Sequence, residues 1–490
     1  MFYIPSYYIC REFIISKNIK QLKPINMKRI FTNLFMMALM LVCAQAVSAQ
    51  SFSGGTGTET DPFKISKAAD LKELSTDVST NMNSFAGSYF IMTQDIDMEG
   101  VTDFQPIGNN FSGDVHAFSG HFNGDGHKIY NLKANWEELG FVGVFGIILN
   151  ATIENLTLAS SDIYGDLGVG GLVGVCMTDN TISNCHTTSD VTVGVRKFYI
   201  AGICGGALIG GANGSVIKDC TNGARIKGCV GYSAGILGTN GQNNMQMIRC
   251  GNYGEISDDQ LHVAGIVAHS KNGISIIDCY NTGKISMLAL EGADNARGAG
   301  ILAIADEVPA EELINVINCY NAGEFNEVNE KIHAIYQGDY VSYNNTTVSS
   351  CYYANDLISG EFDCTTGMAS ADMKTQDFVN KLNGERTGEE ACWTIIEGVN
   401  NGYPVALNEK GVHTAIKAVA DNKMNVTYNA GMVTVSGMAA GAKVVVADIA
   451  GRIVAEAAAD AQGAAVVDMT ALNAGAYIVS ADGKSIKIAK

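Results

Sequence analysis

The sequence is short of positive charge, with 32 lysines and arginines against 50 aspartates and glutamates in 490 residues. Residues 50–490 carry 26 of those basic residues and 49 of the acidic ones. Nucleic acid and anionic lipid are bound mainly through clustered positive charge. We therefore expect neither as a partner, and the acidic balance is typical of a soluble secreted protein.

The short motifs that mark common catalytic and cofactor sites are also missing. There is no HExxH zinc motif, no paired CxxC and no phosphate-binding loop. The segment Gly231-Tyr232-Ser233-Ala234-Gly235 matches the nucleophile elbow of serine hydrolases, but that motif requires a strand–turn–helix, and Gly235 here belongs to a repeat. We expect no catalytic residue, no metal ion, no cofactor and no enzymatic activity.

Long apolar runs are confined to the N-terminal region, so no other segment is predicted to span a bilayer. Lys28-Arg29 precede an apolar run at 34–42, and Val47-Ser48-Ala49 precede Gln50. This pattern predicts a secretory signal peptide over residues 27–49. Residues 1–26 then read as an over-extended gene start, with Met27 as initiator. The alternative is a lipoprotein acylated at Cys43.

Helical periodicity is absent from the middle of the chain, and a β-type repeat takes its place. A cysteine recurs with an apolar residue three positions before it and another six positions after it, at Cys185, Cys220, Cys250, Cys279, Cys319 and Cys351. A second column reads small–Gly–aliphatic, and its glycines step by 31, 33, 30 and 35 residues, at Gly171, Gly202, Gly235, Gly265 and Gly300. A period of this size indicates a solenoid.

Each repeat contains three short β-type runs separated by Gly and Asn turn signals, such as Ala264–Ala268, Ile274–Cys279 and Gly283–Met287. This excludes the helical repeat families. We predict an all-β chain: a right-handed parallel β-helix of roughly eight coils with about 30 residues each, followed by a small C-terminal antiparallel β-sandwich. Identical positions then stack about 4.8 Å apart.

Stacking predicts the role of each column. The cysteines should form a buried ladder of free thiols, because stacked Cα–Cβ vectors are roughly parallel and suit a disulfide poorly. Outside the columns, Cys364 and Cys392 are the more plausible disulfide pair. The asparagines two residues after Cys should form an amide ladder: Asn222, Asn252, Asn281 and Asn321. The glycines should mark a tight corner.

The ends of the solenoid need caps, since an exposed last coil is an open sheet edge. We expect residues 50–130 to form an N-terminal cap and the first coils, with Ser66 capping a short helix that carries Leu71 and Leu74. Residues 131–407 are expected to form the β-helix with its C-terminal cap. Residues 408–416 read as a linker, and 417–490 as a β-sandwich with seven short strands.

Residues 51–405 resemble secreted surface proteins with GLUG-type repeats. The matching features are Gly57-Thr58, Asp61-Pro62-Phe63, Asp95-Ile96-Asp97-Met98, Pro106-Ile107-Gly108, Phe118 to Gly124, Phe141–Gly146, a helix from about Thr375 to Asn383 with Phe378 and Leu382 inward, Trp393, and Gly402-Tyr403-Pro404. The chain departs from that pattern by placing Cys where Leu is more usual. The resemblance implies an extracellular β-helix of the kind found in adhesins, and implies no catalytic residues.

The C-terminal region resembles the sorting domain of type IX secretion cargo. The matching residues are Val446 to Arg452, Asp468-Met469-Thr470 with Leu472, Gly475 to Val479, and the basic tail Lys484–Lys490. This resemblance implies passage across the outer membrane of a Gram-negative bacterium by the type IX machinery, and secretion or surface attachment. The alternative is a β-sandwich with no sorting role.

Two features are candidates for ligand binding. Tyr280, Tyr320 and Tyr352 follow Cys on three successive coils, so alternation points them outward, where they would either stack on sugar rings or be covered by loops as a stabilising ladder. The coil after Ile285 carries an insertion with Glu291, Asp294 and Arg297, and insertions in repeat proteins often form binding loops. The alternative for the insertion is neutral variation in length.

Two further groups of charged residues are weaker candidates for a catalytic site and a cation site. Asp258-Asp259 with His262, and Arg225-Ile226-Lys227 elsewhere, faintly resemble sites of β-helix polysaccharide hydrolases, which need carboxylates that converge on one face. Asp95 and Asp97 could hold a cation, although two carboxylates supply fewer oxygens than Ca²⁺ prefers.

The sequence therefore favours an adhesin-like binding protein, secreted or on the cell surface, whose ligand is a glycan or a host extracellular protein. The loops near residues 286–312 and a flat side of the helix are the expected contact surfaces. The alternatives are a β-helix polysaccharide-degrading enzyme, hydrolase or lyase, and a structural surface spacer.

Overall fold

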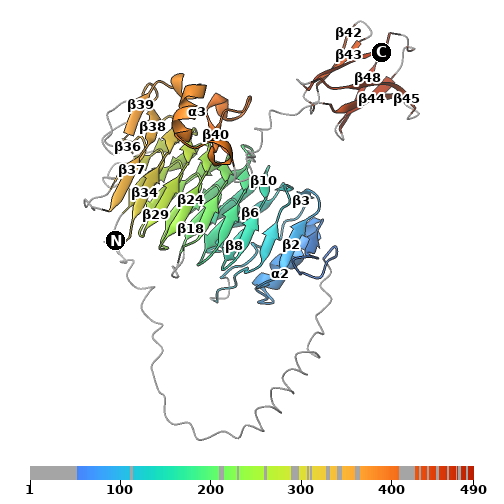
Figure 1. Ribbon diagram of the computed structural model, residues 1–490. Helices are drawn as coiled ribbons and strands as arrows, with labels where there is room; N and C mark the ends of the chain where they lie inside the picture. Colours follow the sequence, from blue (N-terminus) through green and yellow to red (C-terminus); the bar gives the residue numbers. More distant parts are fainter. Residues whose placement is uncertain are drawn as a thin grey trace, which may run out of the picture. The chain divides into compact units, whose positions relative to one another are not determined.

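The computed structural model describes residues 52–407, apart from 111–113, 209–213, 229–230, 259–261, 288–296, 306–307, 310–311, 327–331, 339–344 and 359–364, and the strands with some of their connections within 425–489. The first described part is a parallel β-solenoid in which each coil contributes strands to up to five sheets (Figure 1). The predicted parallel β-helix is confirmed. The predicted signal peptide, gene start and linker lie outside the described residues.

We number the five sheets in the order in which a coil visits them. Sheet 1 contains β1 (Phe63–Ile65), β2 (Tyr89–Met92), β4 (His121–Asn123), β9 (Thr152–Glu154), β14 (Thr181–Ser183), β19 (Val216–Lys218), β24 (Met245–Ile248), β29 (Ile274–Ile277), β34 (Ile314–Ile317) and β37 (Thr346–Ser349). Sheet 2 contains β3 (Ile96–Asp97), β5 (Lys128–Tyr130), β10 (Thr157–Ala159), β15 (His186–Thr187), β20 (Thr221–Asn222), β25 (Gly251–Asn252), β30 (Tyr280–Asn281), β35 (Tyr320–Asn321), β38 (Cys351–Ala354) and β39 (Thr365–Met368).

The other three sheets are shorter. Sheet 3 contains β6 (Lys133–Trp136), β11 (Asp162–Gly165), β16 (Thr192–Val195), β21 (Arg225–Lys227), β26 (Ile256–Asp258) and β31 (Ile285–Met287). Sheet 4 contains β7 (Phe141–Val142), β12 (Gly168–Gly170), β17 (Tyr199–Ala201), β22 (Tyr232–Ala234), β27 (His262–Ala264), β32 (Arg297–Ala299) and β36 (Ile332–His333). Sheet 5 contains β8 (Phe145–Ile148), β13 (Val173–Cys176), β18 (Cys204–Ala207), β23 (Leu237–Asn240), β28 (Val267–Ser270) and β33 (Leu302–Ala305).

A complete coil therefore has five short strands where the sequence predicted three runs. Two of the breaks fall inside the predicted runs, between β27 and β28 and between β29 and β30. The residue just before the Cys column, or before its equivalent Leu156, has positive φ, between 51° and 57°, at Asn155, Asn184, Asp219, Arg249, Asp278, Asn318 and Ser350. Asn and Asp tolerate this left-handed conformation better than most residues, which explains their recurrence there and the corner that ends each strand of sheet 1.

The cysteine ladder is confirmed. All six column thiols are buried in the main hydrophobic core and are free. Each Sγ lies 3.1–3.5 Å from the carbonyl oxygen two residues earlier, and 3.4–3.7 Å from a carbonyl of the preceding coil. Cysteine thus combines an apolar side chain with a weak donor for a corner carbonyl. Cys392 is also a free, buried thiol, so the prediction that it is disulfide-bonded is wrong; Cys364 lies outside the described residues.

The asparagine ladder is confirmed as well. Each Nδ2 donates to Oδ1 of the next coil, at 2.7 Å from Asn222 to Asn252, 2.7 Å from Asn252 to Asn281, and 2.8 Å from Asn281 to Asn321. The glycine corner packs directly against this ladder. A Cβ added at Gly265 would lie 2.2 Å from the Gly300 carbonyl oxygen and 2.5 Å from Asn281. The predicted tight corner is therefore a close contact across the coil, which leaves no room for a side chain.

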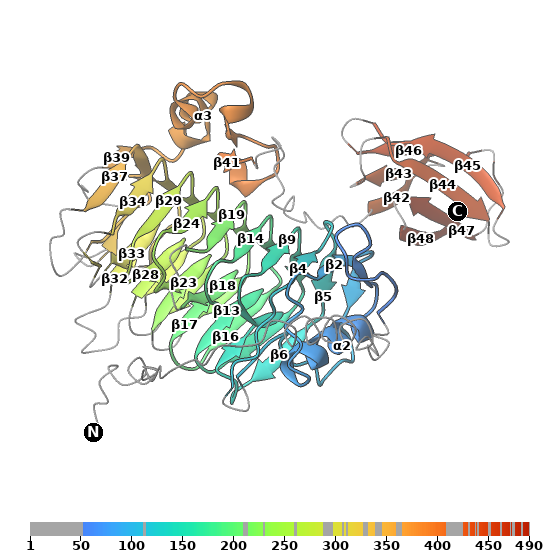
Figure 2. The same cartoon turned by 60° about the horizontal axis from the view of Figure 1, so that its bottom comes forward.

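Figure 2 shows α2 at the N-terminal end of the solenoid and α3 beside its last coils. The first helix, α2 (Ala68–Ser79), buries Leu71 and Leu74 as predicted, but Ser66 is not its cap residue. The N-cap position is Lys67, and Ser66 donates its backbone N–H to the Asp70 carboxylate at 2.8 Å. A side chain from the first turn of α2 therefore holds the residue that precedes the N-cap.

The C-terminal cap folds back onto sheet 2. It contains the 3₁₀ turns η1 (Asp372–Lys374), η2 (Gly388–Glu390) and η3 (Asn400–Gly402), the helix α3 (Gln376–Asn383), and the antiparallel pair β40 (Trp393–Thr394) and β41 (Val405–Ala406). Thr375 caps α3, and Phe378 and Leu382 are buried, as the sequence predicted. Among the described residues, none of the helices combines the length and apolar character required to cross a membrane.

The C-terminal part is the predicted antiparallel sandwich. One sheet contains β42 (Asn425–Asn429), β43 (Met432–Ser436) and β46 (Ala465–Asp468); the other contains β45 (Ile453–Ala458), β44 (Lys443–Asp448), β47 (Ala476–Ala481) and β48 (Lys484–Ala489). The core between them includes Val433, Val446 and Val479. The alternating valines of its strands place apolar side chains inward at every second position.

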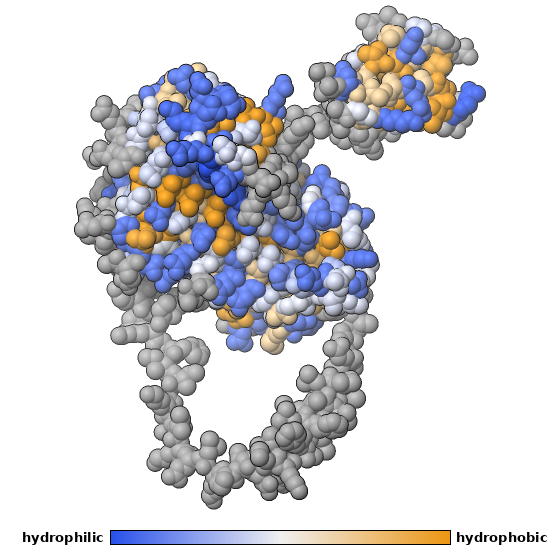
Figure 3. Space-filling model, in the orientation of Figure 1, coloured by the Kyte–Doolittle hydropathy of each residue, from blue (hydrophilic) through white to orange (hydrophobic). Residues whose placement is uncertain are grey.

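The solvent face of sheet 1 is partly apolar. Ile248, Ile277 and Ile317 occupy the same register position on β24, β29 and β34 and are partly exposed. Figure 3 shows hydrophobic side chains gathered over these strands. The same column holds polar residues in earlier coils, such as Glu154 and Lys218, so the apolar character is confined to the later coils.

Candidate ligand-binding groove on sheet 3

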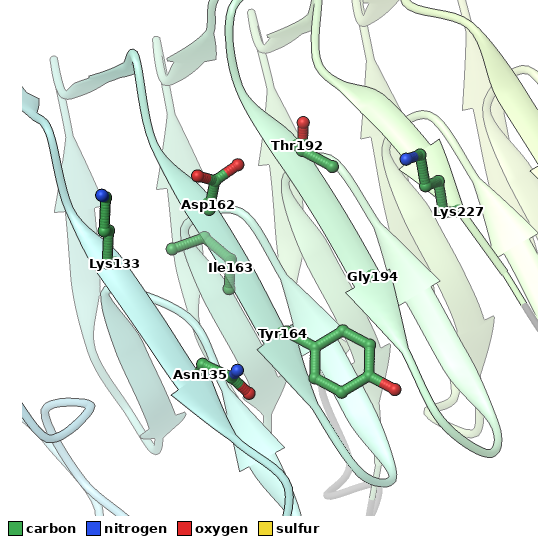
Figure 4. A pocket seen from close by; sticks show the side chains of 8 residues that line it. All are labelled: Lys133, Asn135, Asp162, Ile163, Tyr164, Thr192, Gly194 and Lys227. Atoms are coloured by element: carbon green, nitrogen blue, oxygen red, sulfur yellow. The ribbon is translucent and has the colours of Figure 1, made fainter.

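A shallow groove of about 480 Å³ lies on the solvent face of sheet 3, across β6, β11, β16 and β21 (Figure 4). Strand alternation creates it. The central residues Ala134, Ile163, Val193 and Ile226 are aligned across the four strands and are buried in the core. The residues on either side of them therefore point outward, and they form two parallel rows along the solenoid.

The first row consists of charged and hydroxyl side chains. It runs across the coils as Lys133, Asp162, Thr192 and Arg225. The second row runs as Asn135, Tyr164, Gly194 and Lys227. All of these except Arg225 line the groove, and Lys133, Asn135, Asp162 and Lys227 are exposed. A molecule in the groove would meet donors and acceptors along its whole length.

Tyr164 is the aromatic residue of the groove. Its neighbour in the row is Gly194, and Figure 4 shows the tyrosine ring directed toward the strand of this glycine. A Cβ added at Gly194 would lie 2.8 Å from Cδ2 of Tyr164. The glycine thus leaves the space into which the ring leans, so that the ring lies against the sheet and keeps an accessible face.

This arrangement suits a carbohydrate. Sugar rings present apolar C–H faces that pack on aromatic rings, and their hydroxyls need donors and acceptors nearby. Tyr164 supplies the ring, while Asn135, Thr192 and Asp162 supply amide, hydroxyl and carboxylate groups within the same groove. The groove is open and lies on a rigid sheet, which fits a chain that passes along the surface.

The structure places Tyr280 and Tyr320 elsewhere and covers them. They point out of the coil, as alternation predicted, and their rings stack with centroids 5.5 Å apart. The C-terminal cap then packs on them: Trp393 lies 5.9 Å from Tyr280 and 5.6 Å from Tyr320, and both tyrosines are buried. Burial raises the pKa of both phenols. The prediction that these two residues form an exposed sugar-binding row is therefore wrong. They form the alternative, a stabilising ladder that other parts of the chain cover.

Tyr352 is the third member of that row and is only partly buried. Its ring lies 5.3 Å from Phe378 in an edge-on contact, so it also supports α3. The insertion residues Glu291 and Asp294 lie outside the described residues. Arg297 lies on β32 and is paired in register with His262, on sheet 4. The structure thus does not bring the sequence-predicted binding residues together, and none of them lines the groove on sheet 3.

The polar side chains of the weaker candidate sites are engaged in contacts with other residues of the protein. Ser233 of the elbow-like segment is fully buried in β22 and donates a hydrogen bond to the Asp258 carboxylate, which is also buried. Asp95 contacts His127 at 3.2 Å and Lys128 at 3.7 Å. Asp97 accepts hydrogen bonds from the backbone N–H of Glu99 and from the side chain of Asn131, which lower the pKa of its carboxyl group. Within the described ranges, no cluster of three His, Cys, Asp or Glu side chains has metal-site geometry.

Sequence reasoning missed the groove because of one register error. The apolar column six residues after Cys was assigned to Val191 in one coil and Ile226 in the next. The structure pairs Ile226 with Val193 instead. When the register of this coil is shifted by two residues, the polar–apolar–polar triplets of the four strands align, and Tyr164 and Gly194 become neighbours. The alternation itself was visible in segments such as Asp162-Ile163-Tyr164.

Comparison with known proteins identifies no family, and no family model matches the chain. Halomucin of Haloquadratum walsbyi is 33% identical over 147 residues, which is 28% of this chain and 2% of that protein. A "putative Gly-rich membrane protein" of Evansella cellulosilytica is 32% identical over 137 residues, 26% of this chain and 14% of that protein. The matches therefore span only a small part of either relative.

A solved structure supports the fold. The crystal structure of a "putative immunoglobulin A1 protease" from Bacteroides ovatus has a TM-score of 0.51 and 20% sequence identity, and the match covers 72% of this chain and 95% of that chain. At this level of identity the likeness concerns the fold alone, and function has to be argued from the site itself.

Proposed function

We propose that this protein is a secreted or surface-displayed β-solenoid that binds a carbohydrate chain in the groove on sheet 3. The observation that carries the proposal is Tyr164, a partly exposed ring leaning over Gly194 and flanked by Asn135, Thr192 and Asp162. An accessible aromatic face with convergent polar groups is the usual arrangement of a sugar subsite. The loops near residues 286–312 remain proposed secondary contacts.

A glycan array with the purified protein tests this proposal. We expect binding to a subset of glycans, reduced at least about tenfold by Tyr164→Ala, because the ring contributes an aromatic contact worth about 1.5 kcal/mol or more. The matched control is Tyr89→Ala, which removes a partly exposed tyrosine from sheet 1, where it stacks on His121. Absence of binding to every glycan by the unaltered protein would refute the proposal.

The surface location rests on the predicted signal peptide at 27–49, on the resemblance of 417–490 to a type IX sorting domain, and on partial similarity to a halomucin and a protein named as a membrane protein. Immunoblotting of cell fractions and of culture supernatant tests it. Retention of the unprocessed chain in the cytoplasm would contradict it.

An enzymatic role is the alternative raised by the name of the Bacteroides ovatus structure. Incubation with immunoglobulin A1, and separately with polysaccharides, would reveal new fragments or new reducing or unsaturated sugar ends. We expect neither, because the one serine in an elbow-like motif is buried against Asp258. Turnover lost in Ser233→Ala but retained in Tyr164→Ala would favour the enzyme.

A further inference from the structure

The lysines of the groove differ from most other cations that the structure describes on the solenoid. Lys128, Arg196, Lys197, Arg225, Arg249 and Arg386 all form ion pairs with carboxylates. Lys133 and Lys227 line the groove and are exposed, and neither forms an ion pair with a described residue. They place two available ammonium groups beside Tyr164 in a protein whose net charge is −18.

The two lysines lie at opposite ends of the groove. Lys133 is on β6 and Lys227 on β21, and the register places three inter-strand steps between them. At about 4.8 Å a step, this corresponds to about 14 Å along the solenoid axis. Tyr164 lies between them on β11. A chain lying along this axis could place one anionic group at each lysine and a sugar ring over the tyrosine.

Asp162 limits which anion fits. It is the one acidic residue among the groove-lining residues, and its register partner in the first row is Lys133. Its carboxylate can accept hydrogen bonds from sugar hydroxyls, but it repels a negative group placed over β11, between the two lysines, where no ammonium group offsets the repulsion. A ligand with spaced negative charges is therefore favoured over one charged at every unit.

We infer that the groove binds an acidic carbohydrate chain whose carboxylates are separated by uncharged sugars. Lys133 and Lys227 hold two carboxylates, Tyr164 stacks on the ring between them, and Asp162 and Asn135 bind its hydroxyls. This inference rests on the proposed function, since it adds the charge of the ligand to the proposal that the groove binds a carbohydrate. Charge-assisted hydrogen bonds from lysine to carboxylate supply the selectivity.

The test compares two probes with the same backbone. Hyaluronan oligosaccharides carry one carboxylate on every second sugar, and carboxyl-reduced hyaluronan carries none. By calorimetry at low salt, we expect the native oligosaccharide to bind at least about tenfold more tightly, and the double variant Lys133→Gln/Lys227→Gln to lose that preference. The binding of the native form should weaken as salt rises, because the exposed charges are screened.

The control variant Lys64→Gln/Lys381→Gln makes the same change in net charge at two exposed lysines, on β1 and α3, and should retain the preference. Thermal unfolding of each variant checks that it is folded. Equal binding of both probes, still lost in Tyr164→Ala, would overturn the inference and leave the proposed function standing. Tight binding of single-stranded DNA at the same lysines would overturn both, and so would a failure to bind any carbohydrate.

Discussion

Asp278 shows how one residue can serve the coil and the cap together. It occupies the left-handed corner before the Cys column, with φ of 55°. Its buried carboxylate accepts hydrogen bonds from Arg386 at 2.9 and 3.0 Å and from the Trp393 indole at 3.0 Å. These contacts raise the pKa of Arg386. A single carboxylate therefore links two residues of the cap to the coil beneath it.

Replacing this carboxylate should be costly. Asp278→Ala leaves the guanidinium of Arg386 without its partner and puts a Cβ-only residue at positive φ, so we expect a loss of about 3 kcal/mol in the free energy of unfolding. Denaturant titration measures it. Asp278→Asn keeps the tolerance for the left-handed conformation and one accepting oxygen, and loses the charge and the second acceptor, so its loss should be smaller. Equal losses would show that the carboxylate contacts dominate and that the backbone conformation contributes little.

Three of the column thiols, Cys220, Cys279 and Cys319, should be unreactive in the folded protein. Burial raises the pKa of Cys220, Cys279 and Cys319 well above the ordinary thiol value. Raising the pH from 7 to 9 should therefore not produce the thiolate that reacts with iodoacetamide. Peptide mapping should find these three cysteines unlabelled in the native protein and labelled in guanidinium chloride. Labelling of the native protein that increases with pH would contradict this prediction.

Among the elements, the corner between sheets 4 and 5 leaves little room for a side chain. A Cβ on Gly300 would lie 2.2 Å from the Ala334 carbonyl oxygen, a backbone atom that cannot yield without moving the next coil. Gly300→Ala should therefore destabilise the protein by several kcal/mol, comparable with severe overpacking. The matched control is Gly298→Ala on β32, where the nearest atom is Cγ1 of Ile332 at 3.2 Å. Equal melting temperatures for the two variants would contradict this reading.

The elements also show which parts of the structure could be predicted from sequence. Stacking turns a repeated Cys, Asn or Gly into a ladder, so Cys279, Asn281 and Gly265 could be placed from their spacing alone. The burial of Tyr280 by the cap could not be predicted, because Trp393 lies more than a hundred residues away in the sequence and its docking depends on tertiary contacts. The groove required the register between Val193 and Ile226, and the extra residues after Cys185 hid it.

At the scale of the whole molecule, the C-terminal cap protects the last coils of the solenoid on the side of sheet 2. It buries Tyr280 and Tyr320 under α3 and β40 and covers part of sheet 2. Deleting residues 376–407 should expose these aromatic faces, and we expect the truncated chain to self-associate or to be degraded. Light scattering and limited proteolysis would show it. A monomeric, protease-resistant product would mean that the coils are stable without the cap.

The amide ladder has a polarity that bears on the length of the molecule. Each amide donates toward the later coil, and the series stops at Asn321, whose Nδ2 is buried without an acceptor because the next register position is Tyr353. The ladder itself does not fix the number of coils, since each asparagine makes the same hydrogen bond as the one before. The tyrosine and the cap set the end of the ladder. Duplicating one internal repeat should therefore lengthen the solenoid by one coil, with one more asparagine in the ladder, and leave both ends unchanged.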